Sequence, residues 1–506
     1  MKNHAAITKK TAALMALLLA GALVSGCSDR GSSAVTADAA DTGTASVAES
    51  SADDVVRPED LIPASLPDAD YGGAEFRILI WDADNPLHVY FEFDVEEQNG
   101  ELLNDAIYNR NAVIEERFGV TITQESENDP SARLKKDVMS GDTAYQIITD
   151  WPTRLASAST NGYLLDLYTV PHLQLDAEWW DQNAIQTYTL MDRLYFTSGD
   201  YLLYDKQRVL VLFYNRTLAE RLDIRDLYTT VFDGKWTIDL FNTCCTDAAY
   251  DLNGNGKMGE PEDRFGLLSG SYTYLPYFLM GAGSRYSTTN ADGTHSLAID
   301  TEHTVTTIDR YGKTLFDETN TVYMEDLVKK TGENMICMTM FQSGQALFYH
   351  EVSQEVRLFD MDDAFGVLPQ PKFDETQENY LSAVQMEWSE AMGIPSTLAG
   401  ETLEMTGVLL EALSAVSSST TYPAFIEEIM LAKKAPDAES ADILRMIHDN
   451  LLYDVFGIFK IGGIDQAVMD NLYKKQGKDF MSTIEKRRSR VETDYEKLID
   501  SYSNME

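Results

Sequence analysis

Aromatic and acidic side chains follow the ends of several strands that the sequence predicts. An aromatic ring offers a flat apolar surface, and a carboxylate accepts hydrogen bonds from hydroxyl groups. Because open α/β sheets bind ligands beyond the carboxyl ends of their strands, such side chains are candidates for binding a small polyhydroxylated molecule, with core packing as the alternative for each ring. The candidates are Trp81, Asp82, Asp150, Trp151, Tyr204, Tyr272, Tyr274, Tyr349, Glu351, Trp388 and Glu390.

One loop matches a metal-binding pattern along its whole length. Residues 251–262, DLNGNGKMGEPE, fit the calcium-loop motif D-x-[DN]-x-[DN]-G-x5-E. Calcium takes roughly six to eight oxygen ligands, and Gly256 permits the sharp turn that the motif needs. A metal-free Asn-Gly turn is the alternative, and any calcium bound here is expected to be structural. The expected ligands are Asp251, Asn253, Asn255, the carbonyl of Lys257, and Glu262.

Catalytic motifs are missing from the sequence. It contains no G-x-S-x-G, H-E-x-x-H or Walker A pattern. Glycoside hydrolysis needs two carboxylates across a cleft, but a chain with 82 acidic residues contains many such pairs by chance. We therefore expect a binding protein with no catalytic residues rather than an enzyme. A surface glycoside hydrolase and a polysaccharide-binding adhesin are the alternatives.

The predicted strands and helices that would position the candidate ligand-binding residues alternate along the chain. This alternation over residues 74–149 indicates an α/β lobe with a parallel sheet. Its predicted strands are 74–81, 120–123 and 145–149, and its predicted helices are 104–118 and 132–140. An apolar run, VLVLFY at 209–214, marks a crossover toward further strands at 265–268, 346–349, 365–368 and 391–395.

The length of the chain favours two lobes over one core. We expect a first lobe that is interrupted by the second, because predicted strands resume after the crossover. The expected boundaries are 58–200 for the first lobe, 201–344 for the second, 345–410 for the return to the first, and 411–506 for the rest of the second lobe with C-terminal helices.

The first residues predict export and a lipid anchor. Residues 1–26 combine lysines with an apolar run that is too short to span a bilayer, which is typical of a signal peptide. Cys27 follows Leu-Val-Ser-Gly and resembles a lipobox cysteine, so we expect palmitate or a similar lipid there, on the extracytoplasmic face of the cell membrane. A plain signal peptide with a chance cysteine is the alternative. Residues 27–57 lack large apolar side chains and predict a disordered tether.

Charge and cysteine content exclude some classes of partner. The formal net charge of −42 repels phosphates, so nucleic acid is not an expected partner. The three remaining cysteines, Cys244, Cys245 and Cys337, form no disulfide framework and are expected as buried thiols.

Several local patterns, in this order and spacing, resemble the extracellular solute-binding proteins of ABC importers, in their sugar-binding, Gram-positive lipoprotein form. Each motif is weak alone, and 235–239 departs slightly from the family pattern. Together they cover most of residues 76–395. The matching stretches are ELLNDAIYNRN at 101–111 with RFGV at 117–120, LFYNR at 212–216, KWTID at 235–239, FQSGQA at 341–346 and GVLP at 366–369.

The resemblance implies a two-lobe periplasmic-binding-protein-like fold of the class II type, with a hinge and an interlobe ligand cleft. It implies that the protein captures a small solute by hinge closure and delivers it to the permease subunits of an ABC transporter. A carbohydrate is the expected ligand, either an oligosaccharide or a monosaccharide, with a polyol or a peptide as alternatives. It also implies a monomer, and structural calcium in the 251–262 loop.

Overall fold

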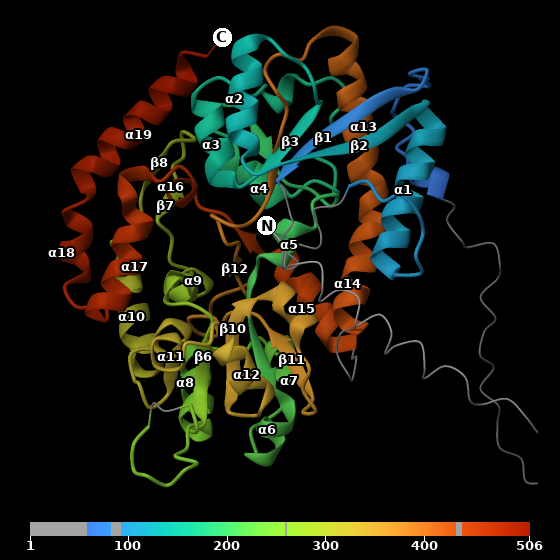
Figure 1. Ribbon diagram of the computed structural model, residues 1–506. Coiled ribbons are helices and arrows are strands. Elements are labelled where there is room, and N and C mark those ends of the chain that lie inside the picture. The colour runs from blue at the N-terminus through green and yellow to red at the C-terminus, as the bar shows by residue number, and fades with distance from the viewer. Residues whose placement is uncertain (1–57, 82–92, 259–260, 432–437, 506) are drawn as a thin grey trace, which may run out of the picture. The chain divides into compact units, whose positions relative to one another are not determined.

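The described part of the chain folds around two five-stranded sheets, which occupy the upper and lower halves of Figure 1. This confirms the expected α/β class. The predicted signal peptide, Cys27, the tether and Asp82 lie outside the described residues. The computed structural model describes residues 58–81, 93–258, 261–431 and 438–505.

The first sheet has the strand order β2-β1-β3-β13-β4. β1 is parallel to β2 and β3, whereas β13 is antiparallel to β3 and β4. β1 forms because its sequence, AEFRILIW, has no helix cap or turn residue and buries Phe76, Ile78 and Ile80. The strands are β1 (Ala74–Trp81), β2 (Val120–Glu127), β3 (Ile147–Asp150), β4 (Phe196–Thr197) and β13 (Ala391–Gly393).

Helices connect and cover the parallel strands. α1 (Leu102–Phe118) joins β1 to β2 and ends at Gly119, whose φ of 60° closes the helix in the left-handed region. α2 (Pro130–Ser140) joins β2 to β3 and begins at Asp129, whose side chain accepts a hydrogen bond from the backbone N–H of Ala132. Figure 1 shows α1 and α13 on one side of β1 and β2, and α2 and α3 on the other.

The second sheet has the strand order β11-β5-β10-β6-β9. Its central strand, β10, is buried along its whole length, parallel to β6 and antiparallel to β5. We expected residues 345–410 in the first lobe, but β10 and β11 pair within the second sheet, so the return comes only at β13. The strands are β5 (Leu210–Asn215), β6 (Phe265–Ser269), β9 (Thr321–Tyr323), β10 (Ala346–Val352) and β11 (Phe365–Leu368).

Two chain segments cross between the sheets side by side. The first runs from β4 through α5 (Tyr204–Gln207) into β5, and the second runs from β12 (Ser382–Ala383) into β13. Val209 and Val384 form an antiparallel bridge, and the backbone N–H of Gln385 donates to the carbonyl of Arg208 at 3.0 Å. A paired crossing of this kind is where a hinge is expected.

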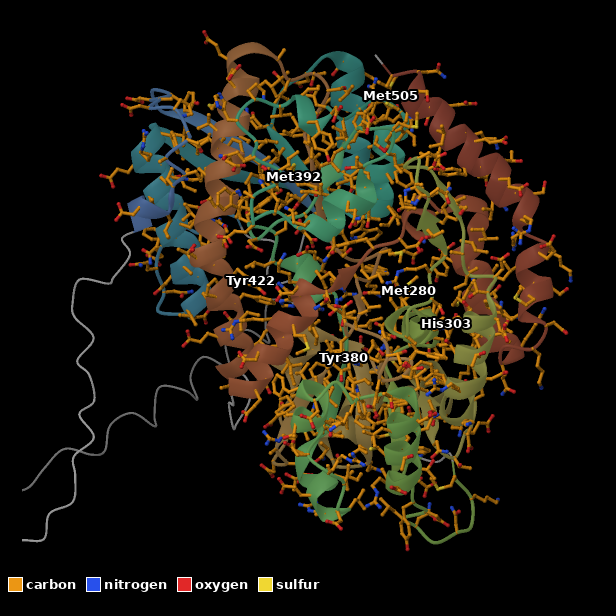
Figure 2. The ribbon with its side chains drawn as sticks, turned by 180° about the vertical axis from the view of Figure 1, so that it is seen from behind. Met280, His303, Tyr380, Met392, Tyr422 and Met505 are labelled. Carbon is orange, nitrogen blue, oxygen red and sulfur yellow. The ribbon has the colours of Figure 1, made fainter. Side chains whose placement is uncertain are left out.

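Two helices in the C-terminal part of the chain pack against elements of both lobes. α14 (Thr421–Leu431) packs on α1, and α15 (Ala438–Asp449) packs on β11. In Figure 2, Tyr422 of α14 lies at a level between Met392 of β13 and Tyr380. Within the described residues, no helix is long and apolar enough to cross a bilayer. Cys244, Cys245 and Cys337 are buried free thiols, as expected.

The remaining elements complete the two lobes. α19 (Arg488–Ser503), one of the C-terminal helices expected within residues 411–506, docks through Tyr502, whose hydroxyl lies 2.9 Å from Ser159 Oγ. The other helices are α3 (Pro152–Thr160), α4 (Gln182–Tyr188), α6 (Arg216–Arg221), α7 (Leu227–Phe232), α8 (Ile238–Ala248), α9 (Leu275–Gly281), α10 (Glu302–Leu315), α11 (Met324–Thr331), α12 (Ile336–Gln342), α13 (Gly400–Ser419), α16 (Val455–Ile458), α17 (Ile464–Lys475), α18 (Phe480–Glu485) and α19 (Arg488–Ser503). Short 3-10 segments are η1 (Pro58–Leu61), η2 (Leu167–Thr169), η3 (Tyr272–Tyr274), η4 (Ser353–Leu358) and η5 (Ile461–Gly463), and short strands are β7 (Ser287–Thr289), β8 (His295–Leu297) and β14 (Leu451–Leu452).

Candidate functional site

A pocket of about 360 Å³ opens beyond the carboxyl ends of β6 and β10, beside the two crossing segments. The crossings contribute Arg208 and Gln385 to its wall. Its volume falls in the range of small-molecule sites. Four of the residues predicted from the sequence line it: Tyr274, Tyr349, Glu351 and Trp388.

Glu351 is a buried hydrogen-bond acceptor in this pocket. Its carboxylate accepts from the hydroxyls of Tyr274 at 2.8 Å and Tyr349 at 3.3 Å. It also accepts from the backbone N–H of Val352 at 2.9 Å. Burial raises the pKa of Glu351, and these hydrogen bonds oppose the rise. The network therefore fixes two tyrosine side chains at the pocket wall.

Arg208 and Glu355 are the other charged residues of the pocket, and the sequence analysis missed both. Arg208 Nη2 donates to Gln385 Oε1 at 2.5 Å, so the guanidinium ties the two crossings together. Burial, and then the nearby charge of Glu351, raises the pKa of Glu355 to about 7. Glu355 lies on η4, one turn beyond β10, where a search of strand ends does not reach. The sequence feature that could have pointed to Glu355 is its position four residues after Glu351.

Two buried polar atoms at the pocket have no hydrogen-bond partner among the described residues. They are Gln354 Oε1, an acceptor, and Arg208 Nε, a donor. Gln354 is only 7% exposed. A buried polar atom without a partner costs roughly 1–3 kcal/mol, so a ligand that supplies the partner recovers that free energy. The pocket thus presents an unused acceptor and an unused donor together.

Three of the chain's six tryptophans form a row that ends at this pocket. The ring centroids of Trp81 and Trp151 are 5.3 Å apart, and those of Trp151 and Trp388 are 4.6 Å apart. The guanidinium of Arg154 lies over Trp151 at 4.0 Å. Trp388 is 39% exposed, so the row ends in an accessible aromatic surface. Trp81 and Trp151 themselves do not line the pocket.

A smaller pocket of about 170 Å³ adjoins the first. Thr273, Gln385 and Trp388 line both, which places Trp388 at their junction. In the smaller pocket, Lys460 Nζ donates to Asp465 Oδ2 at 2.7 Å. The two pockets are therefore neighbours, and Trp388 belongs to the wall of both.

The predicted carboxylates Asp150 and Glu390 are buried beside the first sheet and do not line the pocket. Asp150 is 2% exposed and accepts from Ser131 Oγ at 2.6 Å and from the backbone N–H of Ser131 at 3.1 Å, which anchors the start of α2. Glu390 is 3% exposed, and burial, reinforced by the charge of Asp205, raises its pKa to about 8.

Two predicted tyrosines also lie away from the pocket. Tyr204 is fully buried in α5, with the guanidinium of Arg208 5.7 Å from its ring. Tyr272 stacks on Tyr473 of α17 with a centroid distance of 4.0 Å. Both rings therefore pack against other side chains, which was the alternative to ligand binding. Other residues nearby in the sequence line the pocket instead.

Residues 251–257 of the predicted calcium loop wrap around their own side-chain oxygens. Asp251 Oδ1 and Oδ2 accept from the backbone N–H groups of Gly254 and Gly256, both at 2.7 Å. Asn253 and Asn255 each accept, through Oδ1, a backbone N–H two residues later. These oxygens keep lone pairs for a cation, so the donor set fits calcium. Within the described residues, no three histidine, cysteine, aspartate or glutamate side chains gather as a metal site, and this loop relies on two asparagines.

Comparison with known proteins gives a family match. The model of the bacterial extracellular solute-binding proteins matches residues 104–397. No curated protein sequence matches the chain. A solved cyclo/maltodextrin-binding protein complexed with maltotetraose matches at 13% identity, over 86% of this chain and 99% of that one, with a TM-score of 0.51. This likeness supports the two-lobe fold.

Two further solved structures match at lower TM-scores. An ABC substrate-binding protein from Listeria monocytogenes in complex with cycloalternan shares 13% identity over 85% of this chain and 99% of that one, with a TM-score of 0.48. The maltose/maltodextrin-binding domain MalE from Bdellovibrio bacteriovorus bound to maltotriose shares 14% identity over 85% of this chain and 100% of that one, also at 0.48.

Proposed function

Since this chain belongs to the bacterial extracellular solute-binding protein family, we propose that it captures a carbohydrate in the pocket beside the crossings. It then delivers the carbohydrate to the permease subunits of an ABC transporter. The fold match to a cyclo/maltodextrin-binding protein complexed with maltotetraose makes carbohydrates the first ligand class to test.

One observation carries the proposal. An accessible tryptophan, Trp388, stands beside buried polar atoms that have unused hydrogen-bonding capacity. A sugar ring has apolar C–H faces that stack on an aromatic ring, and hydroxyl groups that both donate and accept. Gln354 Oε1 accepts from a hydroxyl, and Arg208 Nε donates to one, so the ligand satisfies atoms that the empty pocket leaves unpaired.

Ligand capture works through the crossing segments. Arg208, Gln385 and Trp388 belong to the two crossings, while Tyr349 belongs to β10 of the second sheet and Tyr274 to η3, which follows β6. A ligand that touches both groups favours the arrangement in which they lie close together. The contact of Trp388 with Trp151 extends this influence to the first sheet. Closure is thus driven by the ligand's own contacts.

The anchor and the calcium loop complete the proposal. Lipidation of Cys27 would hold the protein at the extracytoplasmic face of the membrane, close to its permease. Calcium would be held by Asp251, Asn253, Asn255, the carbonyl of Lys257, and Glu262. It would fix the loop between α8 and β6 and take no part in ligand chemistry.

A thermal-shift screen of the mature protein against a carbohydrate library tests the function. A ligand that binds only the folded state raises the melting temperature by mass action. We expect hits among sugars, with each bound sugar recovered chemically intact. A flat response to every sugar, or sustained release of hydrolysis products, contradicts the proposal.

A further inference from the structure

The charged side chains that line the pocket of about 360 Å³ beside the crossings include more carboxyl groups than cations. Among the residues that the structure describes, they are one cation, Arg208, and two carboxyl groups, Glu351 and Glu355. Charges in a partly buried pocket interact more strongly than charges in water. If both carboxyl groups ionise, the pocket carries one uncompensated negative charge, which either a proton or a ligand must neutralise.

Glu355 is the carboxyl group left for a ligand. Glu351 already accepts hydrogen bonds from Tyr274, Tyr349 and the backbone N–H of Val352. The guanidinium of Arg208 is engaged with Gln385. Glu355 has a side-chain hydrogen bond with the adjacent Gln354.

We propose that the captured solute carries a positively charged nitrogen beside its hydroxyl groups, as an amino sugar does, and that this nitrogen pairs with Glu355. The inference rests on the proposed function and names the class of carbohydrate. The unpartnered Gln354 Oε1 supplies a second acceptor for the N–H groups, and Arg208 Nε supplies a donor for a ring hydroxyl.

Two further features favour a cationic ligand. The formal net charge of −42 produces a long-range field that attracts cations and repels anions. The exposed face of Trp388 attracts a cation through its ring quadrupole as well as stacking on a sugar face. A neutral sugar gains neither the long-range attraction nor the cation–π attraction.

Binding of the cation should displace a proton. The groups that face Glu355 are Glu351 and Tyr349 on β10, Arg208 on the first crossing, Tyr274 on η3 and Cys337 on α12. Burial and Glu351 raise the pKa of Glu355 to about 7 despite Arg208, so near neutral pH the carboxyl group is partly protonated. An ammonium ion favours the ionised form, and the proton leaves to solvent.

Isothermal titration calorimetry with three matched sugars tests the inference. Glucosamine, N-acetylglucosamine and glucose differ only in the substituent at C2, and their β-1,4-linked dimers differ only at C2 of each ring. We expect the amine to bind roughly tenfold more tightly than either neutral partner, since a charge-assisted hydrogen bond is stronger than a neutral one. Titrations in buffers of different ionisation enthalpy, at a pH below the pKa of Glu355 where the free amine is fully protonated, should show proton release for the amine alone.

Variants localise the effect to one carboxyl group. Glu355→Gln should remove the preference for the amine and the proton release, while neutral sugars still bind, which also shows that the variant folds. Glu355→Asp keeps the charge and should keep part of the preference. Glu220→Gln, on the exposed face of α6, makes the same change in net charge and should alter neither.

The possible results separate this inference from the proposed function. Neutral sugars that bind as tightly as the amine overturn the amino-sugar assignment and leave carbohydrate capture standing. An amine preference that survives in Glu355→Gln also overturns it. Binding of no sugar at all defeats the proposed function, and the inference falls with it.

Discussion

The indole rings of Trp151 and Trp388 meet with their centroids 4.6 Å apart. Strand register explains this contact. Asp150, the last residue of β3, pairs antiparallel with Ala391, the first residue of β13. The residue after one strand and the residues before the other therefore lie at the same sheet edge. β1 runs parallel to β3, so Trp81 at its end joins the row.

Removal of the ring at the end of this row should weaken ligand binding. Trp388→Ala is expected to lower carbohydrate affinity roughly 10- to 100-fold, because aromatic anchors at the centre of a site carry much of the binding free energy. Titration calorimetry measures the loss. Tyr168→Ala removes an exposed ring elsewhere on the first lobe and should leave affinity unchanged. Equal affinity in wild type and Trp388→Ala would place the ligand elsewhere.

Ligand should also bring the lobes closer together. Because the pocket is lined both by the second sheet and by the crossings, saturation with a sugar that binds should decrease the radius of gyration. Small-angle X-ray scattering of the apo and saturated protein measures this change. A sugar that does not bind in the calorimeter is the control. Identical scattering curves with and without a tightly bound ligand would exclude hinge closure.

Sequence reasoning pointed to the sheet edges beside the candidate pocket but could not distinguish which side chains at those edges remain accessible. It identified Glu351 and Trp388 because each adjoins a strand. It also included Asp150, since nothing in the sequence reveals that Ser131 of α2 uses that carboxylate. Hydrogen bonds between distant segments decide such cases, and they depend on the completed fold.

The crossings were harder to anticipate. Arg208 follows the short helix α5, and Gln385 follows β12, a two-residue strand that the sequence analysis did not predict. The hydrogen bond from Arg208 Nη2 to Gln385 Oε1, at 2.5 Å, forms only because two segments far apart in the sequence pair with each other. The boundary expected at residue 345 was wrong for the same reason, because only the observed pairing of β10 with β5 and β6 assigns it to the second sheet.

Glu390 should make stability depend on pH. Burial raises the pKa of Glu390 in the folded state to about 8 from its ordinary value of 4.5, so the folded protein holds a proton that the unfolded chain releases. The contribution is complete below about pH 4.5 and is lost as pH rises through about 8. Glu390→Gln should therefore lose less stability than wild type between these values, by on the order of a few kcal/mol. Urea unfolding measures the difference, with exposed Glu220→Gln as the control; parallel pH profiles for all three proteins would contradict the assignment.

Calcium should stabilise the 251–262 loop and hence the protein. Addition of calcium to protein dialysed against a chelator is expected to raise the melting temperature, because the ion binds only the folded loop. Asp251→Asn removes the charged first ligand and should abolish the rise. Asp309→Asn changes an exposed carboxylate of α10 and should preserve it. A melting temperature that calcium leaves unchanged in wild type would show that the loop is a metal-free turn.

Arg208 should set the pH at which Glu355 exchanges its proton. Its positive charge opposes the effects of burial and Glu351 on the pKa of Glu355, which is about 7. Arg208→Gln removes that opposition, so the pKa of Glu355 should rise and the carboxyl group should stay protonated to higher pH. The pH at which glucosamine binding releases most protons should then shift upward, which calorimetry across a pH series detects. Arg490→Gln, on the exposed face of α19, removes the same charge far from the pocket and should not shift it. If both variants shift the profile equally, general electrostatics rather than the Arg208 guanidinium controls Glu355.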